Sequence, residues 1–560
     1  MTLAGVRRSH RDISPESVGP FQDCSDVLHL VFFFDGTGNN RDADAAEKKW
    51  SNISRLFDAA RDEPPKGIYR LYTSGVGTKL NAKESAITAP WLWVRDSNAA
   101  GGGMGIGANA RLDKGADDLS EALHRALLIN ARKAGGALKS FADKSESESF
   151  QKLNRALANH RLIKIINISV FGFSRGAALA RAFTNRLIKQ CKNDGRGGLT
   201  LEGYPVRFVF LGVFDTVASF GLPAHNGVLP WGGVDLRVSE YVERCVHYVA
   251  GHELRFSFPV DLIRENGSYG RHVERVYPGA HSDVGGGYLP VEQIRLDHLA
   301  RIPLCDMLHE ACGQGVRLLS LKNLKQERPF IYQRMAASED ITKAYKSYAA
   351  LCNASGTVEQ QIRRHMELYY ACYGTLKRRG GLTPTLAQGN AKQEAARREY
   401  EDARREVEAL NRKPIHSRAD AERYSAAVRR QSEAAKRFRA GKEEAESLAE
   451  GLGNIHEEAE YLQQRRQTGK QLRAAAWHDR NRGLLWQVRP EPWMLDAYSR
   501  QTVPDEIVDF FERYVHDSKA GFGMQASVEP FSYFRPRGVF EQLTETGHAP
   551  ASDSPGWPAA

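Results

Sequence analysis

The sequence lacks the features that mark several common classes of protein. Its seven cysteines are odd in number, widely scattered and include no C-x-x-C pair. This pattern argues against a disulfide scaffold or a zinc ribbon and favours folding in a reducing cytosol. No uninterrupted apolar run approaches the roughly 20 residues that a membrane-spanning helix needs. The basic start of the chain is not followed by an apolar segment, so we expect no classical signal peptide and another route for any export.

Motifs for nucleic-acid and metal binding are also missing. The sequence has no helix-turn-helix or zinc-finger pattern and no cluster of metal-ligating residues, so we expect no nucleic-acid partner, no metal and no cofactor. The formal net charge of +10 is a modest excess for 560 residues. It fits an anionic partner such as a phospholipid surface, and it fits a well-solvated surface equally well.

The first half of the chain alternates short β-branched and aromatic runs with helical stretches. This alternation predicts an α/β fold with a mainly parallel sheet covered on both faces. The glycine-rich stretch 99–115 is predicted to be a loop, and residues 116–136 a helix. The five predicted strands cover residues 27–34, 68–72, 163–171, 206–214 and 272–280.

Beyond residue 300 the pattern becomes helical. Small and apolar residues recur at three-four spacing over 390–411 and 419–438, which predicts two charged amphipathic helices in an antiparallel hairpin. A third helix is predicted to start at Asn454, after the glycines of "EGLGN". The predicted division is an N-terminal segment (1–26), an α/β core (27–300), a helical module (301–481), a C-terminal segment that returns to the core (482–545) and a disordered tail (546–560).

The stretch "FGFSRG", residues 171–176, lies between a predicted buried strand and a predicted helix. Gly172 and Gly176 permit a sharp turn and a close helix, leaving Ser174 at the apex in a strained conformation. A serine hydroxyl needs a base and an oxyanion site to act as a nucleophile, and the amide of Arg175 is a candidate oxyanion donor. The pentapeptide alone also fits an ordinary turn, but its setting favours a nucleophile elbow.

An acid and a histidine should follow the serine in this fold. Asp215 ends the fourth predicted strand and is the candidate acid, although a helix or turn cap is an alternative reading. His281 follows the fifth strand and precedes three glycines, which makes it the preferred base. His516 is its rival, because it too follows the acid. Asp283 is interpreted as positioning the loop.

The first predicted strand ends in "FFFDGTGNN". Asp35, Gly36 and Thr37 should lie at the same sheet edge as the serine, so their amides are candidates for the second oxyanion donor. A phosphate-binding turn or an acidic metal ligand is the alternative, but the lysine and serine or threonine of a Walker loop are absent.

The motifs "VFFFDGTGNN", "FGFSRGAALAR", "GVFDTV" and "HSDVGGGY" together resemble the α/β-hydrolase domain of bacterial type VI secretion lipase effectors, first family. The resemblance covers about residues 27–290, and "VHDSKAGFG" resembles the C-terminal part of that family. It implies a serine phospholipase A (A1 and/or A2) with Ser174 as nucleophile, Asp215 as acid and His281 as base. It also implies an antibacterial toxin delivered to a rival's periplasm, with a type VI spike protein and a cognate immunity protein as partners.

Two other functions remain open from the residues alone. One is an α/β-hydrolase that cleaves a different ester or a thioester. The other is a basic binding protein with a vestigial hydrolase core, which would use the predicted hairpin on its partner. The arginine- and lysine-rich hairpin fits anionic headgroups, but its mainly alanine apolar face fits a plain solvated hairpin equally well.

Overall fold

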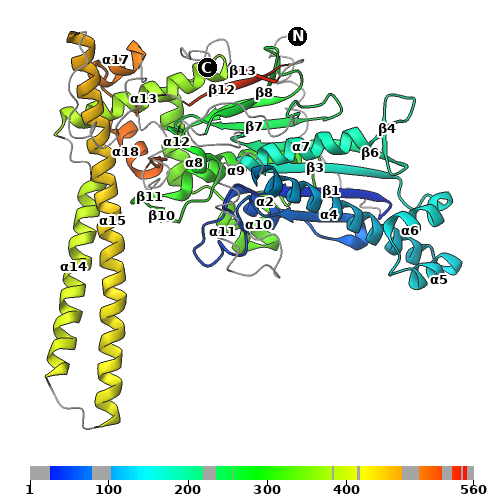
Figure 1. Ribbon diagram of the computed structural model, residues 1–560, viewed down its shortest axis with the longest axis horizontal. Coiled ribbons are helices and arrows are strands. Elements are labelled where there is room, and N and C mark those ends of the chain that lie inside the picture. Colours follow the sequence, from blue (N-terminus) through cyan, green and yellow to red (C-terminus); the bar gives the residue numbers. More distant parts are fainter. Residues whose placement is uncertain are drawn as a thin grey trace.

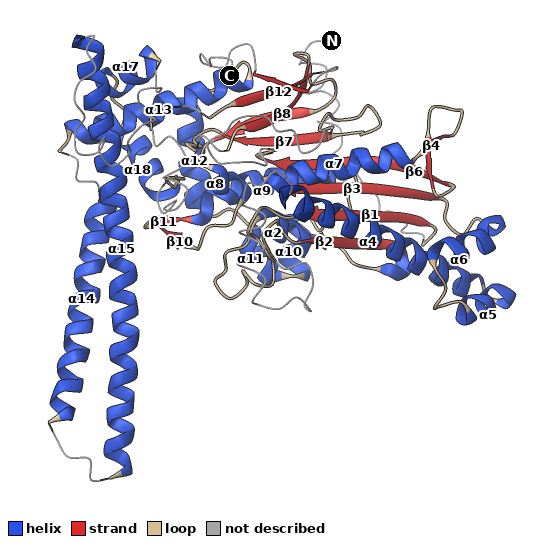
Figure 2. Cartoon of the chain, viewed as in Figure 1, coloured by secondary structure: helices blue, strands red, loops and turns tan. Residues whose placement is uncertain are grey.

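An eight-stranded, mainly parallel β-sheet forms the centre of the protein and has helices on both faces (Figures 1 and 2). The computed structural model describes residues 25–78, 103–218, 235–255, 258–380, 384–412, 417–468, 491–519, 533–535, 537–543 and 547–550. The parallel strands lie in the order β2-β1-β3-β6-β7-β9, and the short β5 and β4 run antiparallel beside the start of β6. The predicted α/β class is confirmed.

All five predicted strands belong to this sheet, as β1, β2, β3, β6 and β9. Sequence analysis did not identify β7, which lies between β6 and β9. The strands of the sheet are β1 (Val27–Phe34), β2 (Ile68–Thr73), β3 (Ile165–Phe173), β4 (Lys192–Asn193), β5 (Leu199–Leu201), β6 (Tyr204–Phe214), β7 (Cys245–Ala250) and β9 (Val273–Tyr277).

Side chains of β1 alternate between two apolar cores, as the two-residue period of a strand requires. Phe32 and Phe34 belong to the core that includes α4 and α7, and Val31 and Phe33 to the core that includes α2 and α9. Both faces of the strand are therefore buried, which explains its continuous apolar run. The helices of the α/β core are α2 (Asn52–Ala59), α4 (Gly103–Ala134), α5 (Gly136–Lys144), α6 (Phe150–Leu157), α7 (Arg175–Gln190), α8 (His281–Gly285) and α9 (Arg301–Gly313).

The glycine-rich stretch before residue 116 is helical from Gly103 onward, so its prediction as a loop was wrong. A glycine costs a helix about 1 kcal/mol, and packing outweighs that cost here. Ala108 and Leu112 are buried in the core beneath α4. A Cβ atom on Gly115 would lie 2.9 Å from the ring of Phe183, so the absent side chain lets α4 approach its neighbours closely.

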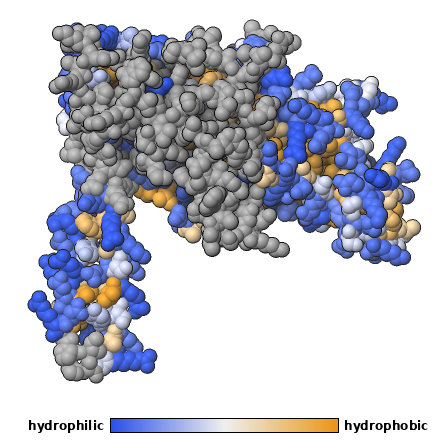
Figure 3. Space-filling view, in the orientation of Figure 1, coloured by the Kyte–Doolittle hydropathy of each residue, from blue (hydrophilic) through white to orange (hydrophobic). Residues whose placement is uncertain are grey.

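The predicted antiparallel hairpin is confirmed as α14 and α15, which extend together away from the sheet (Figure 1). Ion pairs link Arg430 to Glu406 at 2.7 Å and Arg437 to Glu399 at 2.6 Å. The side of this hairpin visible in Figure 3 is mostly hydrophilic. Among the described residues, no helix combines the length and the apolar character needed to cross a membrane. The helices of the module are α10 (Leu321–Glu327), α11 (Pro329–Met335), α12 (Glu339–Cys352), α13 (Val358–Arg378), α14 (Pro384–Asn411) and α15 (Arg418–Thr468).

Helix α15 runs unbroken through the glycines of "EGLGN", so the separate helix predicted from Asn454 is the end of α15. Ile455, Ala459 and Leu462 follow these glycines and are buried in the core that also contains α13 and α17. Burial of this apolar stripe stabilises the helix beyond the glycines, because tertiary packing contributes more than propensity.

The end of the chain folds back onto the core. Helices α17 (Pro492–Arg500) and α18 (Asp505–Tyr514) supply buried residues to the core that contains α12 and α13. Strand β12 (Val539–Leu543) pairs in parallel with β8 (Val260–Glu265), and β13 (Gly547–Pro550) pairs with β12. The predicted disordered tail therefore begins too early, because 547–550 form a strand. Residues 551–560 and the predicted N-terminal segment up to residue 24 lie outside the described residues.

Candidate active site

Ser174 lies at the turn between β3 and α7 with a φ of 58° and a ψ of −129°. A non-glycine residue held in such a conformation costs on the order of 1–3 kcal/mol, so the surroundings must enforce it. They do so through the backbone: the N–H of Ser174 donates to the carbonyl of Phe214 at 3.0 Å, and its carbonyl accepts from the N–H of Val217 at 3.3 Å. The serine is thus fixed to the end of the neighbouring strand β6.

The two glycines of "GFSRG" are required by close backbone packing. A Cβ on Gly176 would lie 2.2 Å from the carbonyl oxygen of Asp35, and one on Gly172 would lie 2.4 Å from the carbonyl oxygen of Gly176. Both distances are far below van der Waals contact. Only glycine therefore lets the first turn of α7 approach the end of β1, which brings the "DGT" loop next to the serine.

Asp215 and His281 form a buried hydrogen-bonded pair at the carboxyl edge of the sheet. Asp215 follows β6 and is fully buried, and the Nδ1 of His281 lies 2.5 Å from its Oδ2. The other oxygen accepts the N–H of Ala250 at 2.8 Å. Burial alone would raise the pKa of Asp215, but the charge of Arg537 and the hydrogen bond from His281 outweigh it and hold that pKa well below its usual range. Asp215 is therefore ionised at neutral pH.

His281 begins the single-turn helix α8 and is packed between two aromatic rings. Its ring centroid lies 4.6 Å from that of Phe173 and 5.1 Å from that of Phe258. Because Phe173 precedes Ser174, this packing places the imidazole beside the elbow. Burial lowers the pKa of His281, more than Asp215 raises it, so the ring is neutral at pH 7. Its Nε2 has no hydrogen-bond partner among the described residues, which leaves its lone pair available.

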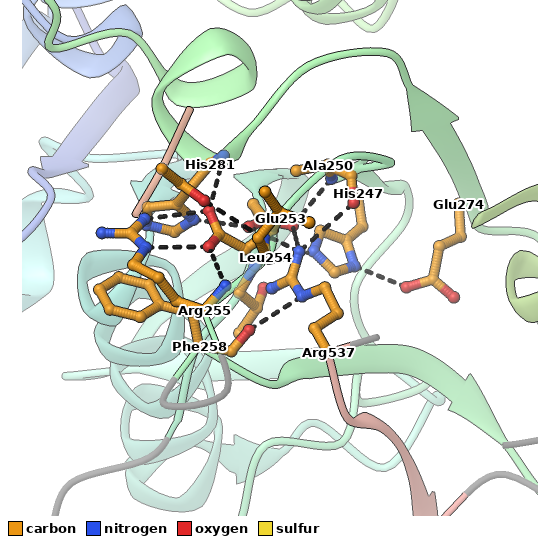
Figure 4. Close-up of polar contacts among 12 residues, drawn as sticks. His247, Ala250, Glu253, Leu254, Arg255, Phe258, Glu274, His281 and Arg537 are labelled. Atoms are coloured by element: carbon orange, nitrogen blue, oxygen red, sulfur yellow. Dashed lines mark hydrogen bonds and ion pairs between the residues drawn. The ribbon is translucent and has the colours of Figure 1, made fainter. Parts of the chain in front are cut away.

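A second set of polar residues surrounds this pair (Figure 4). The N–H of His281 donates to Oε2 of Glu253 at 3.1 Å. Arg255 binds Glu253 at 2.9 Å and lies 3.6 Å over the ring of Phe258. Burial opposes ionisation of Glu253, but Arg255 outweighs it and lowers the pKa of Glu253 to about 2. An ionised acid therefore supports the backbone that carries His281.

The loop that carries Asp215 is also held by a histidine of strand β7, His247. Nε2 of His247 accepts the N–H of Thr216 at 3.0 Å, and Nδ1 of His247 lies 2.5 Å from Glu274. Figure 4 shows His247 beside Ala250 and Arg537, with Glu274 on the opposite side of the imidazole. Sequence analysis missed His247 because it lies on β7, the strand that was not identified. All six residues of β7 are buried, so the strand pattern gives no sign of a polar role for His247.

The "DGT" loop offers one of its three candidate oxyanion donors. The N–H of Asp35 donates to the carbonyl of Thr73 at 3.0 Å, and the N–H of Gly36 donates to the Asp35 carboxylate at 2.8 Å. Neither group is thus available for a ligand. The N–H of Thr37 has no partner within the described ranges, and Thr37 Oγ1 accepts from Nε of Arg175 at 2.6 Å, which joins the loop to the elbow.

The carboxylate of Asp35 is the shared hydrogen-bond acceptor of several side-chain hydroxyl groups. It accepts hydrogen bonds from Ser51, Ser54 and Tyr72 at 2.6–2.8 Å. Burial raises the pKa of Asp35, while these bonds lower it. With both oxygens used by side-chain hydroxyls, the geometry favours a structural role over the alternative of a metal ligand.

His516, the rival base, pairs with a different acid. Its Nδ1 lies 2.6 Å from Oδ1 of Asp283, its N–H donates to Oδ2 at 3.0 Å, and its ring stacks on Tyr288 at 3.9 Å. Asp283 also accepts the N–H of Ala280 at 2.9 Å. The structure therefore brings His281 to Asp215 and places His516 behind the loop that carries His281.

Comparison with known proteins adds to this geometry. The model of the family described as "T6SS, Phospholipase effector Tle1-like, catalytic domain" matches residues 29–192 and 190–310, about half of the chain. The chain belongs to this family of type VI secretion phospholipase effectors. The matched range includes Ser174, Asp215 and His281 and ends before His516 and Arg537.

One solved structure shares the fold of this Tle1-like chain. A crystal structure of an uncharacterized protein from Pseudomonas aeruginosa matches with a TM-score of 0.65 and 23% identity, over 92% of this chain and 79% of the other. A Tle1 effector solved in complex with the VgrG spike of the type VI system matches at 24% identity over 47% of this chain and 51% of the other, but its TM-score of 0.28 is too low to show a shared arrangement. No curated protein matches the chain.

Proposed function

We propose that this Tle1-like effector is a serine-dependent phospholipase A that cleaves A1 and/or A2 acyl esters of glycerophospholipids. The observation that carries the proposal is the buried Asp215–His281 pair beside the strained elbow of Ser174. Family membership supports the lipid substrate. The neutral imidazole, with Nδ1 directed to an ionised acid, supports the role of His281 as base.

In this mechanism, Nε2 of His281 takes the proton of the Ser174 hydroxyl while Oγ attacks the ester carbonyl carbon. Asp215 stabilises the imidazolium that forms. The backbone N–H groups of Thr37 and Arg175, joined through the 2.6 Å contact between their side chains, donate to the oxyanion. The proton on Nε2 then passes to the leaving alkoxide, which departs as a lysophospholipid. His281 then takes a proton from water as the water oxygen attacks the acyl-serine carbonyl, and it returns that proton to Oγ of Ser174 as the fatty acid leaves.

The decisive experiment measures fatty-acid release from vesicles of phosphatidylethanolamine and phosphatidylglycerol. Ser174→Ala should abolish release, whereas Ser169→Ala, which changes a buried serine of the preceding strand β3, should keep it. Hydrolysis by the folded Ser174→Ala protein would contradict the mechanism. Lipids labelled at one acyl position separate A1 from A2 cleavage.

A short water-soluble ester tests the alternative substrate class. If wild type hydrolyses the short ester and leaves vesicles intact, the mechanism stands and the phospholipid assignment fails. If neither is cleaved by the folded wild type, a different ester or thioester becomes the substrate to seek.

We also propose the target-cell periplasm as the place of action, with a spike protein as carrier and a cognate immunity protein in the producer. Membership of a type VI effector family supports these partners. Fusing the chain to a periplasmic signal in a susceptible bacterium should make it toxic, and Ser174→Ala should remove the toxicity. Toxicity that is equal without the signal would contradict a periplasmic target.

A further inference from the structure

Asp215 accepts a buried arginine from the far end of the chain. Nη1 of Arg537 lies 2.7 Å from Oδ1 and 3.0 Å from Oδ2 of Asp215, and Nε of Arg537 donates to the carbonyl of Phe258 at 2.9 Å. Arg537 is only 2% exposed and Asp215 is completely buried. Figure 4 shows the guanidinium reaching toward the loop of Ala250 and Phe258. A fixed positive charge therefore contacts the carboxylate that holds His281.

The backbone fixes where this arginine lies. Arg537 lies two residues before β12, and the N–H of Val260 donates to the carbonyl of the intervening Gly538 at 2.9 Å. Val539 then pairs with Val260 in the parallel register of β12 and β8. A shift of β12 by one residue would turn the guanidinium away from Asp215, because side chains alternate along a strand. Strand pairing thus sets the distance between Arg537 and the acid.

The helical module anchors the same part of the chain. Tyr533 donates its N–H to Glu458 on α15 at 2.7 Å, and its carbonyl accepts the hydroxyl of Tyr370 on α13 at 2.8 Å. Farther along, Glu541 lies 3.2 Å from Arg264 on β8. The segment that carries Arg537 is therefore attached to the helical module on one side and to strand β8 on the other.

We propose that Arg537 is a positioning residue of the active site, which the C-terminal return supplies to the catalytic acid. This proposal rests on the proposed function, because it requires Asp215 to act through His281. Arg537 holds the carboxylate in one orientation and balances its charge in a buried site. The match to the family's catalytic domain ends at residue 310, so the active site would then need Arg537, which lies more than two hundred positions further along the chain.

The charge balance predicts a pH effect with a definite sign. The ionisable groups around the pair are Arg537 at the acid, and Glu253 and Arg255 at the histidine. Without the arginine, the negative charge of Asp215 is uncompensated, so the Asp215–His281 pair binds its extra proton more tightly. Activity requires the unprotonated pair, so the acid limb of the rate profile should move to higher pH by about one unit.

The test measures how fast an alkyl fluorophosphonate labels Ser174 at different pH values, because this probe needs no identified lipid substrate. In Arg537→Gln, we expect the acid limb to move upward and the plateau rate to fall on the order of 10²-fold. Arg513→Gln is the matched control, since Arg513 is exposed and, within the described residues, forms its ion pair with the exposed Asp509, four positions earlier on α18. A folded Arg537→Gln protein with an unmoved limb overturns the proposal.

Loss of one partner of a buried pair can also prevent folding. In that case Arg537→Lys is the variant that tests the proposal, because lysine keeps the positive charge but lacks the planar guanidinium group. The acid limb of the pH–rate profile should then stay at the same pH, while the labelling rate falls about tenfold because Asp215 is displaced. A wild-type rate in Arg537→Lys overturns the positioning role. If wild type is not labelled, or Ser174→Ala is labelled equally, the proposed function itself fails.

Discussion

The contact between β1 and the turn that carries Ser174 can be tested with one added methyl group. A Cβ on residue 176 would lie 2.2 Å from the carbonyl oxygen of Asp35 and 2.5 Å from that of Phe34. Both neighbours are backbone atoms, so no side-chain rotation relieves the clash. The start of α7 must then retreat by about 1 Å to restore ordinary contact. Overpacking of this kind costs about 1–3 kcal/mol of stability.

The same displacement should impair the chemistry of Ser174. It separates the amide of Arg175 from Thr37, and a misplacement of about 1 Å can lower a rate on the order of 10²-fold. Gly176→Ala should therefore unfold at a lower temperature and react more slowly with a fluorophosphonate probe, as thermal unfolding and labelling kinetics can show.

Gly313→Ala is the matched control for this substitution. Gly313 ends α9, and a Cβ placed there meets no atom within 4 Å. We expect unchanged labelling and equal or higher stability, since alanine favours a helix by about 1 kcal/mol over glycine. If Gly176→Ala matches wild type in both unfolding temperature and labelling rate, the reasoning about the elbow is refuted.

Three further predictions concern histidines. The labelling rate of wild type should be at its plateau at pH 7 and decline only below about pH 6.5. The reason is that the pKa of His281 is lowered and the neutral ring is the active form in the proposed mechanism. A decline that starts above pH 7 would contradict this. His281→Ala should lower the labelling rate by about 10²–10⁴-fold. His516→Ala should retain most of the rate in the folded fraction, since His516 pairs with Asp283. Equal losses in the two folded variants would contradict the assignment of His281 as the base. Burial lowers the pKa of His365 to about 3, so this histidine makes the protein less stable as pH falls below 6.5, by up to about 1.4 kcal/mol per pH unit. His365→Phe should reduce that slope in pH-dependent unfolding, and the exposed His309→Gln should not.

The sequence by itself determined five strands of the sheet and the order of the catalytic candidates. Continuous apolar runs such as 27–34 have to be buried on both faces, so they identified parallel strands without knowledge of their neighbours. The glycines of "GFSRG" mark a site where backbones approach too closely for a side chain, so Ser174 stood out locally. The same holds for the three-four spacing of the hairpin. Each of these features depends on residues close together in the chain.

Tertiary structure decided everything that depends on distant contacts. The helical start of α4 and the unbroken α15 override local glycine signals, because packing contributes more free energy than propensity. The sequence favoured His281 over His516 but could not show which acid each histidine meets, since each acquires its acid only when the loops come together. Arg537 has no local signal at all. It reaches Asp215 because β12 pairs with β8, two strands that lie far apart in the chain.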